Sequence, residues 1–173
     1  LEFRRVLFRS ALGRLKMLGN ELDQALVETE FAFELNPKSL LYMDMIGFQL
    51  AFLGEWQRGV ELIKKAISLN PFYRVQMRFA LWADYFRQEN YLAALAETDL
   101  LHGTGDFWGP LARAATLGQL DRISEGEAAV EELLSYKPGF RERGRVLIGH
   151  GIKDVELADR ITGGLRKSGL PIN

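Results

Sequence analysis

The stretch Leu35-Asn36-Pro37 returns as Leu69-Asn70-Pro71, and the two prolines lie 34 residues apart. Small residues recur in the same register, twelve and five positions before each proline: Ala25 and Gly59, then Ala32 and Ala66. A small residue at a fixed position marks a point where two helices approach too closely for a larger side chain, and a proline cannot continue a helix. The pattern predicts a repeating unit of two helices that ends at a proline.

Period, closing prolines and small residues together resemble the tetratricopeptide (TPR) repeat, a helix-turn-helix unit of 34 residues. The resemblance implies an all-α fold, with TPR-type units stacked in a right-handed superhelix. In such an array each unit contacts only its neighbours, so stability comes largely from the interfaces between successive units.

Residues 11–138 read as an array whose first repeat is truncated and is followed by three more. The first repeat retains a remnant of its first helix, Ala11 to Leu18, before a turn at Gly19-Asn20. The second is the most regular and begins near Ser39, a suitable N-cap. The third lacks the proline, and the fourth ends at Pro138. The repeat-ending prolines are Pro37, Pro71 and Pro138, and the small residues expected where helices pack are Ala25, Ala32, Gly47, Gly59, Ala66, Ala94 and Gly126.

The two ends of the chain depart from the repeat pattern. Leu7-Phe8-Arg9-Ser10 looks like a translated sequencing adapter, so residues 1–10 are expected to be a non-native leader on a fragment of a longer protein. Residues 139–173 are expected to form capping helices. Their last segment, Asp154 to Ser168, carries apolar residues at helical spacing, which suits a helix that covers the exposed apolar end of a repeat array.

Composition narrows the class of protein. The chain has 173 residues, 47% of them hydrophobic, which is enough for a substantial core. A formal net charge of −1 gives no electrostatic reason to expect a nucleic acid or an anionic membrane as a partner. There is no cysteine, so disulfides and thiolate metal sites are excluded. The apolar stretch from Leu40 to Gly54 is too short to cross a bilayer, and a cytoplasmic location is the expectation.

A more specific resemblance rests on four further runs of residues. These are Phe107-Trp108-Gly109-Pro110-Leu111, Leu117-Gly118-Gln119-Leu120, Glu131-Glu132-Leu133-Leu134 and Gly164-Leu165-Arg166-Lys167-Ser168-Gly169-Leu170-Pro171. They are similar to the C-terminal TPR tail of bacterial class III adenylate/guanylate cyclase-like proteins and of related winged-helix regulators. In that family the tail follows a catalytic or DNA-binding domain. Neither activity carries over, because no paired metal-binding aspartates and no basic recognition helix occur here. Trp82 also stands where the general repeat has a small residue.

No catalytic, cofactor-binding or metal-binding residues are predicted. His102 and His150 are far apart, and neither has a second ligand at helical spacing. Gly103-Thr104-Gly105 lacks the strand and the lysine of a phosphate-binding loop and reads as a linker. Ser124 has a simpler role as a helix cap, with Glu127 three positions later, than as a nucleophile.

The strongest candidate site is a peptide-binding groove. In a TPR superhelix the first helix of each unit lines the concave face, where aromatic side chains can anchor an extended peptide or a helix. By the repeat register the candidate groove residues are Asp44, Phe48, Phe79, Phe86, Trp108 and Leu111. Ordinary core is the alternative for each apolar member, because apolar residues at helical spacing are usually buried. Arg74, Arg78 and Arg87 lie nearby and could pair with an acidic partner or be solvated.

The sequence therefore predicts a non-catalytic protein-protein interaction or scaffold module, as the regulatory tail of a larger bacterial signalling protein. Its partner would be a protein, a peptide or the upstream domain of its own parent chain. Two alternatives stay open. The tail could position or dimerise the catalytic domains of a cyclase, or the array could be a homo-oligomerisation scaffold with the N-terminal repeat end as the contact surface. The sequence leaves the oligomeric state undetermined.

Overall fold

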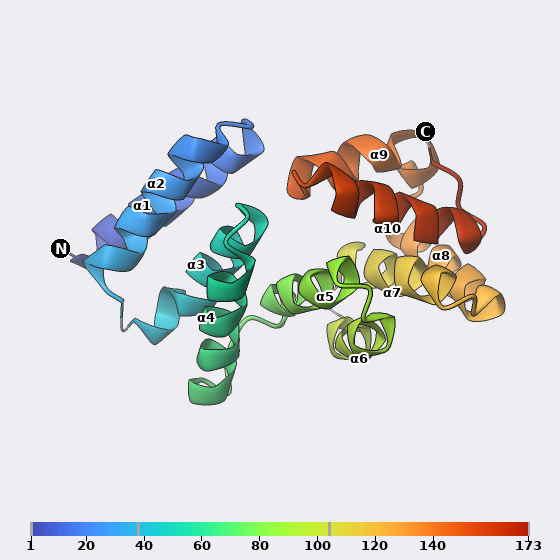
Figure 1. The fold of residues 1–173 in the computed structure, drawn as a ribbon, viewed down its shortest axis with the longest axis horizontal. Helices are drawn as coiled ribbons and strands as arrows, with labels where there is room; N and C mark the ends of the chain where they lie inside the picture. The colour runs from blue at the N-terminus through green and yellow to red at the C-terminus, as the bar shows by residue number, and fades with distance from the viewer. Residues whose placement is uncertain (1, 38, 104, 173) are drawn as a thin grey trace. The chain divides into compact units, whose positions relative to one another are not determined.

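The computed structural model describes residues 2–37, 39–103 and 105–172 and is helical, with no strand among those residues. The elements are α1 (Glu2–Leu18), α2 (Leu22–Leu35), α3 (Leu40–Phe52), α4 (Trp56–Leu69), the 3-10 helix η1 (Val75–Met77), α5 (Arg78–Arg87), α6 (Tyr91–Leu101), α7 (Trp108–Gln119), α8 (Ile123–Tyr136), α9 (Phe140–Gly151) and α10 (Val155–Lys167). The expected all-α class is confirmed. Figure 1 follows the helices along the chain.

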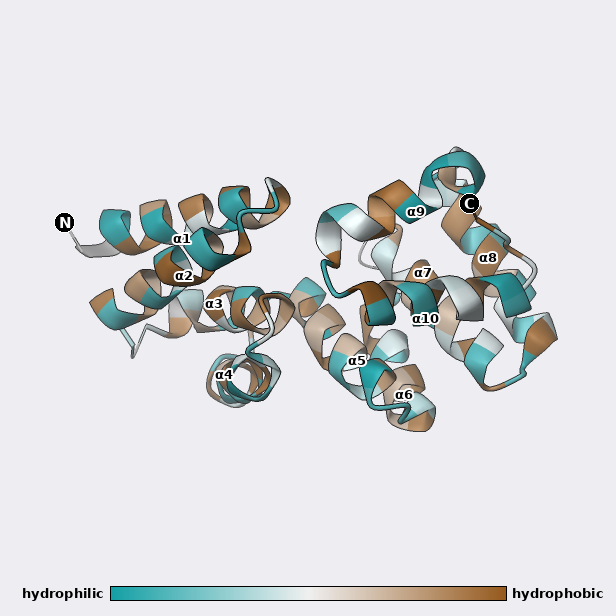
Figure 2. Cartoon of the chain, turned by 45° about the horizontal axis from the view of Figure 1, so that its top comes forward, coloured by the Kyte–Doolittle hydropathy of each residue, from teal (hydrophilic) through white to brown (hydrophobic). Residues whose placement is uncertain are grey.

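The chain divides into two compact units, Leu1–Ala80 and Leu81–Asn173. In the first unit, α1 packs against α2 and α3 packs against α4 as antiparallel pairs (Figure 1). The core includes Val6, Ala32, Tyr42, Ile46 and Leu50, so α1, α2 and α3 share it. Figure 2 shows polar and apolar residues alternating around α1, as expected for a helix with one face on a core.

In the second unit, α7 is the central helix. Its residues 109–112 and 114–118 are buried, and it packs against α6, α8 and α10. The last helix, α10, is amphipathic: Leu157, Ile161 and Leu165 are buried on one side. The helix that closes this unit therefore packs on α7 rather than chiefly on its sequence neighbour α9.

The first helix of each pair ends in the same hydrogen-bonded turn. After α1, α3, α5 and α7 one residue adopts positive φ, namely Asn20, Gly54, Glu89 and Asp121 respectively. In each case the amide of the following residue donates to a carbonyl five residues before it. Such a left-handed residue satisfies carbonyls at a helix C-terminus. The turn also closes α10, where Gly169 has φ 80° and Leu170 donates to Leu165. The second helices α2, α4 and α8 are followed instead by the C-cap residues Asn36, Asn70 and Lys137, each directly before a proline.

Several helix boundaries differ from the sequence prediction. Helix α1 begins at Glu2, not at Ala11, because Val6 and Ser10 are buried on the same face as Gly13 and Met17. The first helix of this repeat therefore has 17 residues, and it includes residues 2–10 of the predicted leader. That residues 1–10 are non-native stays a prediction. At the other end, α9 is continuous from Phe140 to Gly151 and includes Gly149.

Two further boundaries have a visible cause. The first helix of the third repeat, α5, starts only at Arg78, after the extended residue Arg74 and η1. The backbone N–H of Arg74 donates to the Asp44 carboxylate at 3.3 Å, which holds Arg74 in an extended conformation before η1. Helix α8 starts at Ile123, with Arg122 as N-cap, so Ser124 does not cap it. Ser39 does occupy the N-cap position of α3, without a side-chain bond.

Candidate interaction surface

Asp44, the polar member of the predicted groove, is a buried structural anchor. Its carboxylate accepts hydrogen bonds from its neighbour's amide, Met45 N, at 2.7 Å and from Arg74 Nε at 3.0 Å, and it forms an ion pair with Arg74 Nη2. Only 5% of its side chain is exposed. Because the carboxylate is already satisfied and buried, Asp44 fastens the segment before η1 to α3 and does not present a free charge to a partner.

The two phenylalanines of the first unit belong to an aromatic cluster. The Phe48 and Phe52 ring centroids lie 4.7 Å apart, and Phe79 stacks on Phe52 at 6.0 Å. Trp56 meets Phe52 edge-on at 5.3 Å. Phe79 is buried, whereas Phe48 is half-buried at the edge of the cluster. Of this pair, Phe48 alone keeps surface that a partner could contact.

In the second unit, Phe86 and Leu111 are fully buried. Phe86 packs between Trp82 at 5.1 Å and Tyr91 at 5.3 Å. Burial also raises the pKa of the Tyr91 hydroxyl, with the Glu89 charge adding to the shift. The groove assignment of Phe86 and Leu111 is therefore wrong, and the core alternative holds, since neither side chain can reach a partner.

Trp108 opens α7 and remains half-buried. It stacks on Phe107 with ring centroids 4.7 Å apart, and Phe107 in turn packs on Phe140 at the start of α9 at 5.8 Å. A side chain added at Gly151 would meet the Trp108 ring at 3.0 Å. Trp108 thus holds the two ends of α9 near α7.

All seven predicted packing residues are buried: Ala25, Ala32, Gly47, Gly59, Ala66, Ala94 and Gly126. A close approach in the first unit joins α3 and α4. A Cβ built on Gly59 would lie 2.5 Å from the amide nitrogen of Ala51, and one on Gly47 would lie 2.7 Å from the Gly59 carbonyl oxygen. No side chain fits there, so glycine is required on both helices. Gly126 meets a different element, because a Cβ there would collide with Ser168.

Sequence reasoning missed the contact that closes the second unit. A Cβ on Gly118 of α7 would overlap the Gly164 carbonyl of α10, and one on Gly164 would overlap the Ala115 carbonyl. The Ser168 hydroxyl, fully buried, donates to the Ala114 carbonyl at 2.8 Å. The pair Gly163-Gly164 inside a helical pattern was the available signal, since glycine in a helix interior is costly without a packing reason.

Trp82 replaces the small residue that the general repeat has at its position, and the structure accommodates it through a polar contact. Trp82 is completely buried, and its indole Nε1 donates to Thr116 Oγ1 at 2.9 Å. Thr116 itself donates to the Ala112 carbonyl at 2.7 Å. The hydroxyl therefore joins α5 to α7 where a smaller side chain would have left a cavity.

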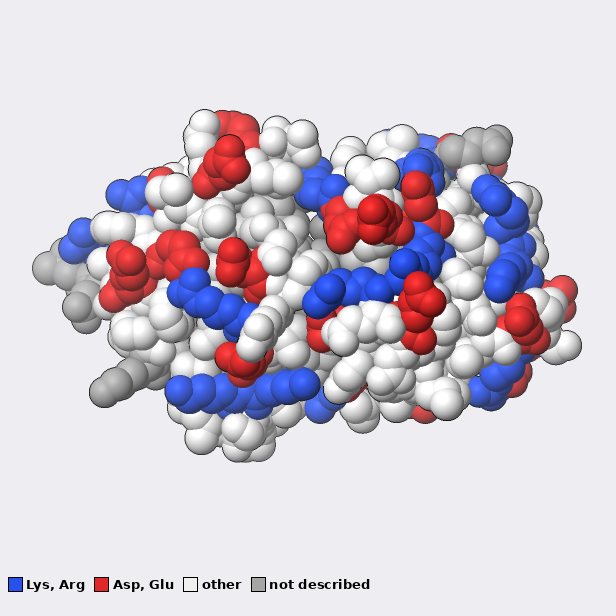
Figure 3. Space-filling model, in the orientation of Figure 1, with Lys and Arg blue, Asp and Glu red and all other residues white. Residues whose placement is uncertain are grey.

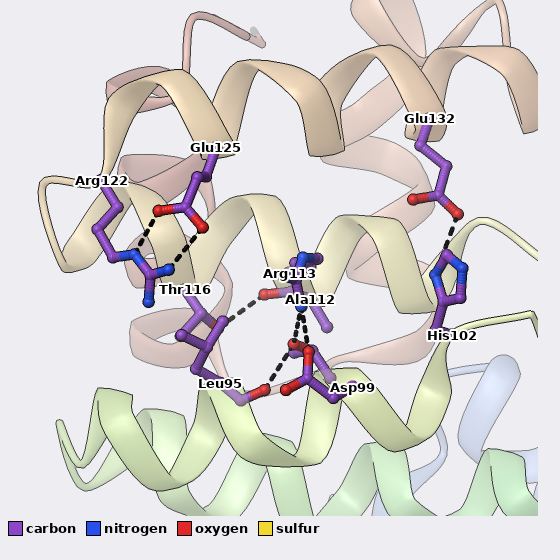
Figure 4. A network of polar contacts seen from close by, with 10 residues as sticks. Leu95, Asp99, His102, Ala112, Arg113, Thr116, Arg122, Glu125 and Glu132 are labelled. Atoms are coloured by element: carbon purple, nitrogen blue, oxygen red, sulfur yellow. Dashed lines mark hydrogen bonds and ion pairs between the residues drawn. The ribbon is translucent and has the colours of Figure 1, made fainter.

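The polar side chains around α6, α7 and α8 form ion pairs rather than a convergent constellation (Figure 4). Arg113 pairs with Asp99, and exposed His102 lies 3.7 Å from a Glu132 oxygen. Hydrogen bonds from Arg122 lower the pKa of Glu125. His102 is thus placed beside a carboxylate of α8, and Ser124 is exposed on the same helix.

Comparison with known proteins identifies the repeat. The solved structure of MamA MSR-1 C2, a TPR-like all-helical protein, superimposes with a TM-score of 0.58 at 16% sequence identity, covering 95% of both chains. The fold is of the TPR type. No protein-family model and no curated protein matches the chain. The resemblance to cyclase and winged-helix tails consequently has no support from these comparisons.

Among the described residues there is no helix with the length and apolar character of a membrane span. The same part of the chain has no group of three or more histidine, cysteine, aspartate or glutamate residues arranged to hold a metal ion.

Proposed function

We propose that the chain is a non-catalytic protein-protein interaction module that acts as a scaffold. The TPR-type helix pairs within each unit support this, because repeats of this type present side chains of their first helices to partners. The observation that carries the proposal is that Phe48 and Trp108, both on first helices, stay partly exposed, whereas Phe52 and Phe140 of the aromatic groups around them are buried. Partly exposed aromatics on rigid helices are the usual anchors of a protein interface.

The finer proposal is that the module is the regulatory tail of a larger bacterial signalling protein and works in the cytoplasm. It would then bind a protein or peptide, or dock on the upstream domain of its own parent chain. Reading the source DNA upstream of the Ala11 codon tests this. If a cyclase or winged-helix domain is encoded there, the next experiment is to test whether the module docks on that domain. If only further TPR units and a start codon are found, the hypothesis that the module is a regulatory tail is contradicted.

The interaction role is tested by replacing Phe48 and Trp108 with alanine. Wild type and variant are used as baits in extracts of the source organism, and bound proteins are identified by mass spectrometry. We expect one protein to be recovered reproducibly with wild type and lost with the double variant, while helicity by circular dichroism is unchanged. The control is Phe52→Ala, which removes the buried centre of the same cluster and lowers stability instead. General unfolding of the Phe48 and Trp108 variant would contradict the surface role.

Homo-oligomerisation is a second candidate, favoured by the exposed apolar side chains of α1. Leu7, Phe8, Leu15 and Leu18 are between 46% and 65% exposed. Contiguous apolar surface of this kind commonly marks a protein contact. Light scattering over a concentration series tests it, with Leu15→Lys as the variant. A monomer at every concentration would reject this candidate.

A further inference from the structure

A groove of about 400 Å³ lies along the outer side of α2. Its lining comes almost entirely from α2, with one residue from α1: Leu26, Val27, Glu28, Glu30, Phe31, Glu34 and Arg9. Val27 is 65% exposed, and Phe31 is half-buried beside it. The groove therefore has an apolar floor and acidic sides, and acidic side chains are visible over α2 in Figure 3.

The groove already holds a guanidinium group. Arg9 Nη1 donates to Glu28 Oε1 at 2.9 Å and to Oε2 at 2.6 Å, and the Arg9 Cζ atom lies 4.7 Å from the Phe31 ring centroid. A carboxylate and a ring face three residues apart on one helix lie on the same side of it. Together they satisfy the charge and the planar surface of a guanidinium.

A second pair on α2 has the same design. Arg58 of α4 donates from Nη2 to Glu30 Oε2 at 2.7 Å, and its Nη1 bonds the other oxygen. Its Cζ atom lies 5.1 Å from the Phe33 ring centroid. Hydrogen bonding to Glu30 raises the pKa of Arg58. Two Glu-x-x-Phe pairs on one helix, Glu28 with Phe31 and Glu30 with Phe33, thus hold arginines in the same way.

The groove has capacity beyond Arg9. Glu34 lies three residues after Phe31 and is exposed. It can therefore approach the same ring from the other side. Val27, one turn before Phe31, adds apolar surface that a leucine or a methylene stem could cover.

We propose that this groove binds an arginine-bearing segment of a protein partner. The partner's guanidinium would lie on Phe31 between the carboxylates of Glu28 and Glu34, with its apolar residues on Val27 and Leu26. Charge complementarity selects this occupant, since three carboxylates line the groove and Arg9 and Arg58 pair with only two of them, Glu28 and Glu30. All recognition groups belong to α2, so Arg9 is an occupant and not a part of the site. This surface lies on a second helix and is separate from Phe48 and Trp108, so the inference goes beyond the proposed function.

Fluorescence anisotropy with defined peptides tests the proposal on the full chain. The probe is a short labelled peptide of arginine, leucine and alanine, and the matched peptides carry citrulline or lysine at every arginine. We expect binding about tenfold tighter for the arginine peptide than for the citrulline peptide, because charge-assisted bonds to the carboxylates are lost. The lysine peptide should lie between them, because an ammonium lacks the planar stacking surface. Equal binding of the arginine and citrulline peptides would overturn the proposal.

Variants locate the binding in the groove. Val27→Lys places a positive charge on the exposed floor, and Glu34→Gln removes a carboxylate; we expect each to weaken arginine-peptide binding about tenfold. The matched controls are Leu92→Lys, 72% exposed on α6, and Glu131→Gln, exposed on α8. The controls are expected to bind as wild type. Losses of the same size in variants and controls would indicate non-specific attraction and overturn the assignment.

Arg9→Ala provides an independent readout, because it should free the guanidinium position and tighten binding. Weaker binding by a folded Arg9→Ala protein would mean that Arg9 belongs to the site, against the proposal. Analytical ultracentrifugation tests whether a second copy of this chain occupies the groove. If the wild type forms dimers and Val27→Lys does not, the occupant is a second copy and the partner proposed here is wrong.

Discussion

In the first unit the close helix crossing joins α3 and α4, the two helices of one repeat, where Gly47 faces Gly59. In the second unit the comparable crossing joins α7 and α10, where Gly118 faces Gly164 and two helices intervene in the sequence. Both crossings bring a backbone within the space of a missing side chain. The repeat period accounts for the first pair, whereas only the path of the chain after α8 accounts for the second.

The difference explains how the second unit closes. Gly126 has the repeat position of Gly59, but its missing side chain makes room for Ser168 beyond α10. Helix α10 also ends in the left-handed turn that ends the first helices, at Gly169. By its packing and its C-terminus, α10 takes the place of a first helix against α7, and α9 is the connection that delivers it there.

The largest expected effect is in the first unit. Gly59→Leu would force a branched side chain against the Ala51 amide and the Gly47 carbonyl. We expect the free energy of unfolding to fall by about 3 kcal/mol, because the atoms that the new side chain meets are backbone atoms, which cannot move aside without shifting a helix. Urea unfolding followed by circular dichroism measures it, with the exposed Lys65→Leu as control. An unchanged midpoint would refute the close contact.

The crossing of the second unit offers a matched pair on neighbouring residues. Gly164→Ala would overlap the Ala115 carbonyl, whereas a Cβ on Gly163 meets its nearest neighbour, Gln119 Nε2, at 3.8 Å. We expect Gly164→Ala to lower the free energy of unfolding by about 1–2 kcal/mol, even after the gain from the higher helix propensity of alanine is counted. Gly163→Ala should raise it by up to about 1 kcal/mol. Equal melting temperatures for the two variants would show that α10 does not cross α7 at Gly164.

The hydrogen bond of Trp82, which stands where the general repeat has a small residue, has an expected effect no larger than that of the Gly164 crossing. Thr116→Val keeps the shape but removes the acceptor of the buried indole N–H. We expect a loss of about 1–2 kcal/mol, the cost of an unsatisfied buried donor. Thr116→Ser, which retains the hydroxyl, should lose less in the same chemical denaturation experiment. If serine and valine are equally harmful, packing and not the hydrogen bond carries the contact.

The turns that end the first helices provide the smallest and most direct comparison, because the two changes have opposite signs. Gly54 has φ 101°, and Asp121 has φ 54° in the equivalent turn. We expect Gly54→Ala to lower the free energy of unfolding by about 1 kcal/mol. Asp121→Gly should raise it by a few tenths of a kcal/mol, even though it removes the exposed ion pair with Lys167. Thermal melts measure both. A gain for Gly54→Ala would contradict the left-handed turn.

Much of the helical architecture could be predicted from the sequence because it depends on local rules. Pro37, Pro71 and Pro138 each follow a helix end, and the small residues at fixed intervals are buried. The start of α5 could not be read this way. It depends on Asp44, thirty residues before Arg74, whose carboxylate holds the Arg74 amide out of the helix.

The candidate groove was harder to predict than the fold. Helical spacing places Phe48, Phe86 and Leu111 on first helices but does not say which side of each helix a neighbour covers. Phe86 and Leu111 are covered and Phe48 is partly open, which depends on contacts far away in sequence. The α2 groove was not predicted, because the charges of α2 are typical of an ordinary solvated helix face. Only the structure places Arg9 on the Phe31 ring and Arg58 on the Phe33 ring.

The sequence by itself determined that this protein is a stack of helix pairs, since period, prolines and small residues act within one unit or between neighbours. The right-handed sense of the superhelix stays a prediction. Only the tertiary structure decided that α10 turns back onto α7 and that Trp82 joins Thr116. The physical reason is that close packing and buried hydrogen bonds between distant segments depend on where whole helices meet, and a local pattern of residues does not encode that meeting point.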